Sequence, residues 1–125
     1  MSGTSSRVTG VRTVAVPVTD QDRAVAFYVD VLGLELRMDA PLDELGGRWI
    51  EVVPVGADTS VALVPAPEGG AGVTTGIRLT TTDAVALHGA LAGQGVDVGE
   101  LVRWPEVPPM FEFRDPDGNT LVVVG

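Results

Sequence analysis

The chain repeats itself at a spacing of about 63 residues, and this repeat constrains the fold more than any other feature. A strand-like run leads into Thr19–Asp20, and a second one leads into Thr82–Asp83 at an offset of 63. The segment QGVDV (94–98) then matches LGLEL (32–36) at an offset of 62. Each half continues with further alternating, strand-like runs. The order strand, helix, strand, strand, strand is therefore predicted twice.

Periodicity places one helix in each half. The first has five apolar residues spaced three or four apart, which share one helical face: Ala24, Phe27, Tyr28, Val31 and Leu32. Thr19 is expected as its N-cap and Gly33 as the residue that ends it. Ala84, Leu87 and Leu91 give the second helix a shorter apolar face.

The strand-like runs follow these helices in both halves. They cover 48–54 and 59–65 in the first half and 110–114 and 120–124 in the second. A sheet of so few strands is not stable alone. We therefore predict an α+β fold in which two βαβββ modules form one curved mixed sheet, with the helices on its outer face and a cup on its inner face.

The domain organisation follows from the same pattern. Residues 66–74 lie in a segment rich in Gly and Pro, which predicts a linker between a module at 11–65 and a module at 75–125. Both modules belong to one domain, 11–125, preceded by a flexible leader at 1–10.

Composition excludes several functions. The net charge of −9 opposes nucleic-acid binding, because few basic groups are present to neutralise phosphates. The chain has no cysteine and one histidine, so a metal site would need oxygen ligands. No apolar stretch reaches the length of a membrane span, and the N-terminus has no signal-peptide core. A cytoplasmic protein without membrane or nucleic-acid partners is expected.

An acidic turn near the C-terminus raises the question of a calcium loop. Asp115, Asp117 and Asn119 alternate, but Gly118 comes too early for an EF-hand loop, and the twelfth position would lie beyond residue 125. Pro116 and Gly118 are typical of a tight turn. The segment is predicted to be a turn that directs the strand 120–124.

Four segments in order resemble one family. VPVTDQDRAVAFYVDVLGLEL, GGRWIEVVPVGADTSVALV, GIRLTTTDAVALHGALAGQGVDV and FEFRDPDGNTLVVV are similar to the vicinal oxygen chelate superfamily, which contains glyoxalases, bleomycin-resistance proteins and extradiol dioxygenases. The resemblance covers about residues 11–124. It implies a cup that is often completed by a second subunit, and therefore a homodimer.

The resemblance also implies where a metal would be held. Metal-using members place one ligand on each of four strands, and the corresponding positions here are Thr13, Leu63, Gly76 and Val122. One hydroxyl and no charge do not make a cation site. We therefore predict that the protein holds no metal and no other cofactor.

Strand alternation nominates further cup residues. Gly76, Arg78 and Thr13 are expected to face the cup. Arg78 is expected to pair with Glu51 or Glu112, because buried charges are usually paired; the alternative is a clamp on an anionic ligand. Trp49 and Glu51 share one strand face, and whether that face lines the cup is left open.

Three other residues are weighed as possible ligand contacts. Trp104, in the proline-rich loop 103–110, either forms a mobile rim or covers a core edge. Phe111 is favoured as a core residue over a ligand contact. His88 is expected on the flank of the second helix, without a functional partner.

Two functional hypotheses follow. The first is a metal-free small-molecule-binding protein that sequesters an organic ligand in an apolar cup, as the bleomycin-resistance branch does. The alternative is an enzyme of the glyoxalase or lyase, isomerase or dioxygenase type, or a metal-free one with Glu51 as general base. The candidate ligand-binding residues are Thr13, Trp49, Glu51, Leu63, Gly76, Arg78, Trp104, Phe111 and Val122.

Overall fold

A computed structural model describes residues 6–125, and the proposed leader at 1–10 falls partly outside them. The first half of the chain forms one module of strands and short helices. Its elements are β1 (Thr13–Val18), α1 (Gln21–Ala26), the π-helical turn η2 (Phe27–Val31), β2 (Glu35–Leu42), the 3-10 turn η3 (Asp43–Leu45), β3 (Gly47–Val53) and β4 (Ser60–Pro65).

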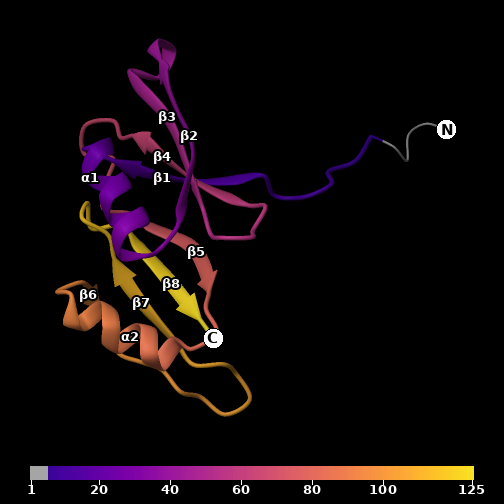
Figure 1. Cartoon of the computed structure of the whole chain (residues 1–125), viewed down its shortest axis with the longest axis vertical. Coiled ribbons are helices and arrows are strands. Elements are labelled where there is room, and N and C mark those ends of the chain that lie inside the picture. The colour runs from indigo at the N-terminus through magenta and orange to yellow at the C-terminus, as the bar shows by residue number, and fades with distance from the viewer. Residues whose placement is uncertain (1–5) are drawn as a thin grey trace.

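The second half repeats this order. Its elements are β5 (Thr74–Thr80), α2 (Ala84–Gly93), β6 (Asp97–Val98), β7 (Met110–Arg114) and β8 (Thr120–Val124). Within the described residues the strands form two four-stranded sheets, ordered β1-β4-β3-β2 and β5-β8-β7-β6. Figure 1 shows α1 beside the first sheet and α2 beside the second. The predicted α+β fold of two βαβββ modules is confirmed, with two four-stranded sheets in place of the one continuous sheet that was expected.

The two sheets have the same internal pairing. The first strand of each module pairs in parallel with the last, β1 with β4 and β5 with β8, and the other pairs are antiparallel. The edge strands β1 and β5 share no ladder in the described part of the chain. No helix among residues 6–125 is long and apolar enough to cross a membrane.

The two ends of the first helical segment were predicted to within one residue. Asp20, not Thr19, is the N-cap of α1, and its side chain accepts a hydrogen bond from the Arg23 backbone N–H. Thr19 is not free for this role because its hydroxyl donates to Asp117. Gly33 ends the helical segment with φ of 83°, as predicted for a residue that must adopt the left-handed region.

One apolar core joins both modules. Val16, Val18, Ile50, Val52 and Leu63 are buried in the same cluster as Ala24 and Tyr28 of the first helical segment. The cluster continues into the second sheet through Phe113, whose ring centroid lies 6.1 Å from that of Phe27. Val16 and Val18 are buried, whereas the preceding Ala15 is exposed, as the alternation of a strand requires.

The acidic segment between β7 and β8 is a turn, as predicted. The Asp115 carbonyl accepts from Gly118 N–H at 2.9 Å, and Gly118 has φ of 83°. Asp115 Oδ1 accepts from the backbone N–H groups of Asp117 and Asn119. Its Oδ2 accepts from the Tyr28 hydroxyl at 2.8 Å. Burial and the neighbouring Asp115 raise the pKa of Tyr28 well above its usual value, so this hydroxyl remains a donor.

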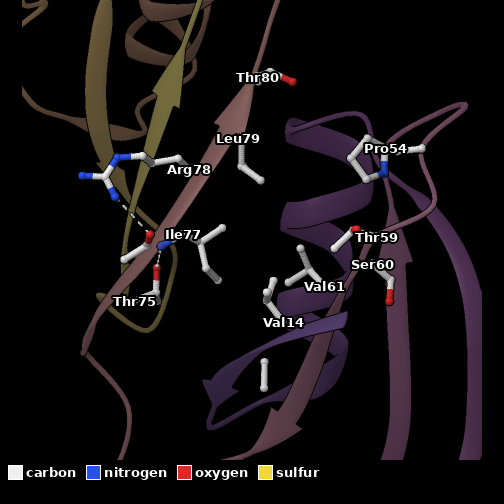
Figure 2. Close-up of a pocket in the computed structure, with 13 residues that line it drawn as sticks. Val14, Pro54, Thr59, Ser60, Val61, Thr75, Ile77, Arg78, Leu79 and Thr80 are labelled. Carbon is white, nitrogen blue, oxygen red and sulfur yellow. Dashed lines mark hydrogen bonds between the residues drawn. The ribbon is translucent and has the colours of Figure 1, made fainter. Parts of the chain in front are cut away.

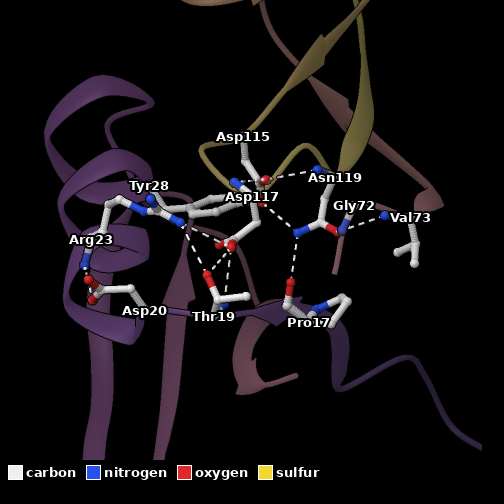
Figure 3. A network of polar contacts seen from close by, with 10 residues as sticks. All are labelled: Pro17, Thr19, Asp20, Arg23, Tyr28, Gly72, Val73, Asp115, Asp117 and Asn119. Atoms are coloured by element: carbon white, nitrogen blue, oxygen red, sulfur yellow. Dashed lines mark hydrogen bonds and ion pairs between the residues drawn. The ribbon is translucent and has the colours of Figure 1, made fainter. Parts of the chain in front are cut away.

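The same turn joins the two modules (Figure 3). Asn119 is fully buried; its Nδ2 donates to the Pro17 carbonyl at 2.7 Å. Asp117 accepts from Thr19 and from Arg23. We call the side-chain bonds of Thr19, Tyr28, Asp115, Asp117 and Asn119 the inter-module latch. The latch fixes the end of β1 and the first helical segment against the β7–β8 turn.

Candidate functional site

A groove lies between the modules, where the edge strand β5 faces β1 and β4 (Figure 2). Its volume is about 650 Å³, which is within the range of small-molecule pockets. Ile77 and Leu79 of β5 point toward Val14 and Val61 of the first sheet and form apolar walls. The groove exists because the edge strands β1 and β5 do not pair with each other, and Val14 of β1 faces Ile77 and Leu79 of β5 across the gap.

A polar cluster lies on the face of the first sheet that is opposite α1. Glu51 of β3 is its centre and is 0% exposed. Its carboxylate accepts from Arg12 at 2.9 Å, Arg37 at 2.5 Å and Trp49 Nε1 at 2.6 Å. Ser60 Oγ lies 2.8 Å from its Oε1. We call these five residues the Glu51 cluster.

The cluster keeps Glu51 ionised. Burial alone would raise the pKa of this carboxyl, but hydrogen bonds from Trp49, Arg37, Arg12 and Ser60 outweigh burial and lower the pKa to about 2. The two arginines remain in contact with solvent, with side chains 65% and 34% exposed for Arg12 and Arg37. The cluster therefore presents two guanidinium groups over one buried carboxylate.

Ser60 connects the cluster with the groove. Its side chain bonds Glu51, and the residue also lines the groove. Ser60 Oγ lies 2.8 Å from Thr13 Oγ1, and Val14 of the same strand forms part of the groove wall. The charged face of the first sheet and the apolar groove therefore meet along the start of β1 and β4.

The strand registers test the four positions at which the family holds metals. Val122 lies opposite Arg78 in the second sheet, and the equivalent pair in the first sheet is Ala15 and Ala62. The counterpart of Val122 is therefore Ala62. Leu63 is 0% exposed and faces the core, so the position assigned from the sequence was one residue off.

The corrected positions are Thr13, Ala62, Gly76 and Val122. One hydroxyl, two hydrocarbon side chains and a glycine do not fit a divalent cation, which needs several oxygen or nitrogen ligands. The nearby Glu51 carboxylate already accepts from four side chains. No group of three or more His, Asp or Glu side chains in residues 6–125 is arranged to hold a metal ion.

The predicted ion pair of Arg78 is wrong. Arg78 is exposed, and its Nη1 donates to the Gly76 carbonyl at 3.3 Å. Glu51 takes its partners from its own sheet and from Arg12, so it is not available to a residue of the other module. Glu112 lies opposite Val122 as Arg78 does, yet the two form no ion pair in the described residues. Figure 2 shows the Arg78 side chain directed away from the groove.

The remaining candidates lie in three places. Trp49 is on the Glu51 side of β3, because Ile50 and Val52 on the other side are fully buried against the helix. Phe111 is 1% exposed, and its ring packs on His88 with centroids 5.0 Å apart. Trp104 is 64% exposed.

A smaller hollow of about 270 Å³ on the second sheet is lined by Phe111 and Val122. The predicted site residues are thus divided between the Glu51 cluster, the groove and this hollow, except that Leu63 lies in the core and Trp104 lies exposed outside all three. Of the predicted set, Gly76 and Arg78 border the groove, although the Arg78 side chain points away from it.

Sequence reasoning missed Arg12, Arg37 and Ser60. Arg37 lies at an irregularity in the pairing of β2 with β3, between Leu36 and Met38. This bulge sets the direction of its side chain, and alternation along β2 does not reveal it. Ser60 shares a face with Thr13, its partner across the ladder, and that pairing was the available signal.

Comparison with known proteins identifies the family. Residues 10–123 match the Glyoxalase/Bleomycin resistance protein/Dioxygenase superfamily, and the chain belongs to it. It is 37% identical to TnmS3, an antibiotic binding protein from Streptomyces sp. CB03234, over 94% of this chain and 95% of that one, with a TM-score of 0.82.

Two further proteins are similar over most of their length. A superfamily member from Sphaerobacter thermophilus DSM 20745 is 36% identical over 94% of this chain and 97% of that one, with a TM-score of 0.85. The uncharacterized protein YetH from Bacillus subtilis (strain 168) is 27% identical over 113 residues, which are 89% of this chain and 93% of the relative.

Proposed function

We propose that this protein is a metal-free small-molecule-binding protein that sequesters an organic ligand in the inter-module groove. The observation that carries the proposal is an apolar groove of about 650 Å³ with walls from both modules. The side chains at the family's four metal positions do not suit a cation, which supports binding without metal chemistry. The likeness to TnmS3 supports an antibiotic-like organic molecule as the ligand.

The alternative hypothesis, an enzyme with Glu51 as general base, has less support. A general base at neutral pH needs a pKa close to 7 and an accessible oxygen. The pKa of Glu51 is lowered to about 2, and the side chain is fully buried beneath its donors. Both properties oppose proton abstraction and support a structural or electrostatic role.

The binding proposal is tested by filling the groove. Ile77→Trp places an indole against Val14 and Val61, so binding of N-phenyl-1-naphthylamine, a neutral fluorescent aromatic, should weaken by more than about tenfold. Val85→Trp is the matched control, because Val85 is 39% exposed on α2. Fluorescence titration measures both. Equal binding by the two variants would refute the groove as the site.

The metal-free state has its own test. Extensively dialysed wild-type protein should carry less than about a tenth of an equivalent of any divalent transition metal by elemental analysis. A stoichiometric metal that survives dialysis would overturn this part of the proposal and favour the enzyme.

We also propose that the protein is a homodimer. All but the last residue of β2 are exposed, and the strand lies at the edge of its sheet with Leu36 47% and Met38 43% exposed. Such edges are usually covered or paired. Sedimentation equilibrium at micromolar concentration should give twice the chain mass of 13.0 kDa. A single species at the chain mass would refute the dimer.

A further inference from the structure

We propose that the ligand is an organic anion, whose negatively charged group binds to Arg12 and Arg37 while its apolar body occupies the groove. This inference rests on the proposed binding function and adds the chemical class of the ligand. It concerns a positively charged surface in a chain whose net charge is −9.

The charges of the Glu51 cluster do not balance. Two guanidinium groups bond a single carboxylate, and both of its oxygens are already used. Glu51 is 0% exposed, whereas both arginine side chains reach solvent. The accessible surface of the cluster is therefore cationic, and its anionic part is hidden beneath it. A second anion would complete the pairing of these arginines.

The two arginines differ in how fully they are used. Arg37 donates to Glu51, to Ser60 Oγ at 2.8 Å and to the Asp58 carbonyl at 2.9 Å. Arg12 donates only to Glu51 within the described residues, and a guanidinium has five N–H donors. Arg37 is thus held in place, while Arg12 retains donors that can bind a carboxylate or sulfonate in the bidentate manner.

The cluster is close enough to the groove to share a ligand with it. Arg12 directly precedes Thr13, and Ser60 belongs to both places. Trp49, which is half-buried and donates to Glu51, adds an aromatic surface beside the guanidinium groups. A ligand with an aromatic body and one negative group matches this combination of apolar walls and free donors.

The negative charge of the rest of the protein should prevent non-specific binding of anions. At a net charge of −9 the distant field repels anions, so their binding depends on short-range contacts with the arginines. Removing one of those arginines should therefore weaken anion binding strongly and leave neutral aromatics unaffected.

The test uses two dyes with the same aromatic body. 8-Anilinonaphthalene-1-sulfonate carries one negative charge, and N-phenyl-1-naphthylamine lacks it. Trp104→Phe leaves Trp49 as the single tryptophan of the two in the chain, so energy transfer from one defined donor reports binding of the dye. In this background the sulfonate should bind about tenfold more tightly than the neutral dye.

The decisive variant is Arg12→Gln, which removes the arginine with free donors and disturbs the cluster least. It should weaken sulfonate binding about tenfold and neutral binding less than about twofold. Arg103→Gln is the control, because Arg103 is exposed, forms no ion pair in the described residues and gives the same change in net charge. A thermal melt of each variant checks the fold.

The outcomes separate the two proposals. If the neutral dye binds wild type in the groove but Arg12→Gln leaves sulfonate binding unchanged, the anion site is refuted and the binding function stands. If neither dye binds, both proposals fail. If Arg12→Gln instead shifts a sedimenting dimer to monomer without altering dye affinity, the arginines bind a second copy of the chain, and the anion site is refuted.

Discussion

Glu51 and Glu112 occupy the same place in the two modules but have opposite surroundings. Glu51 lies opposite Ala62 of β4, and Glu112 lies opposite Val122 of β8. Glu51 is completely buried and accepts from four side chains. Glu112 is exposed, and its carboxylate has no hydrogen bond or ion pair among residues 6–125.

The difference arises in the strand that flanks each glutamate. In the first module β2 runs for 8 residues and brings Arg37 over Glu51. In the second module β6 has only 2 residues, and Gly99 comes close to the Glu112 side chain instead. A duplicated backbone thus supports two different electrostatic environments, because the charges around Glu51 come from Arg37 on the longer edge strand β2 and from Arg12, which precedes β1.

The largest expected effect is on stability. Glu51→Leu removes the charged acceptor shared by Arg12, Arg37, Trp49 and Ser60, and the loss of these hydrogen bonds should cost about 3 kcal/mol in the free energy of unfolding. Glu112→Leu should change it by less than about 0.5 kcal/mol, as is usual for an exposed side chain without partners. Urea denaturation of both variants measures the contrast. Equal losses would show that the two environments do not differ energetically.

Acid should remove the stabilisation that ionised Glu51 provides. The pKa of Glu51 is about 2 in the folded protein and 4.5 ordinarily, so its stabilisation is fully present above pH 4.5 and is lost as the pH falls toward 2. We expect Glu51→Gln to remove about 2 kcal/mol of the acid-induced loss seen in wild type. Denaturation curves of wild type and Glu51→Gln between pH 5 and pH 2 measure this loss, and parallel curves for the two proteins would refute the prediction.

The smallest expected effect on stability distinguishes the two threonines that precede α1 and α2. Thr19 and Thr82 are equivalent in the repeat, but only Thr19 donates its hydroxyl to the latch, through Asp117. Thr19→Val should therefore cost about 1 kcal/mol, the usual contribution of one hydrogen bond, and Thr82→Val close to none. Thermal melts of the matched pair decide this. A similar loss in both would mean that the latch bond contributes nothing.

The fold could be predicted from the sequence because its determinants are local and repeated. The helical stripe around Tyr28 and the turn at Pro116–Gly118 each depend on a few neighbouring residues. The 63-residue offset shows that the same local pattern occurs twice.

The site was less predictable because it depends on contacts between distant segments. Glu51 meets Arg12 from 39 positions away and Arg37 through a bulge, and neither pairing leaves a periodic signal. Arg78 was assigned a carboxylate partner from its strand face alone, and a shared face does not determine the direction of a long side chain. Leu63 was misplaced because a register error of one residue reverses the face.

The latch has a consequence for the order in which the chain folds during synthesis. Its bonds join residues that are 87 to 102 positions apart, from Tyr28 with Asp115 to Pro17 with Asn119. During synthesis the first module leaves the ribosome before residue 119 has been added to the chain. The Tyr28 hydroxyl and the Pro17 carbonyl therefore wait for their partners until the last strand emerges, so the nascent first module is a stage at which chaperones and proteases can act on the chain.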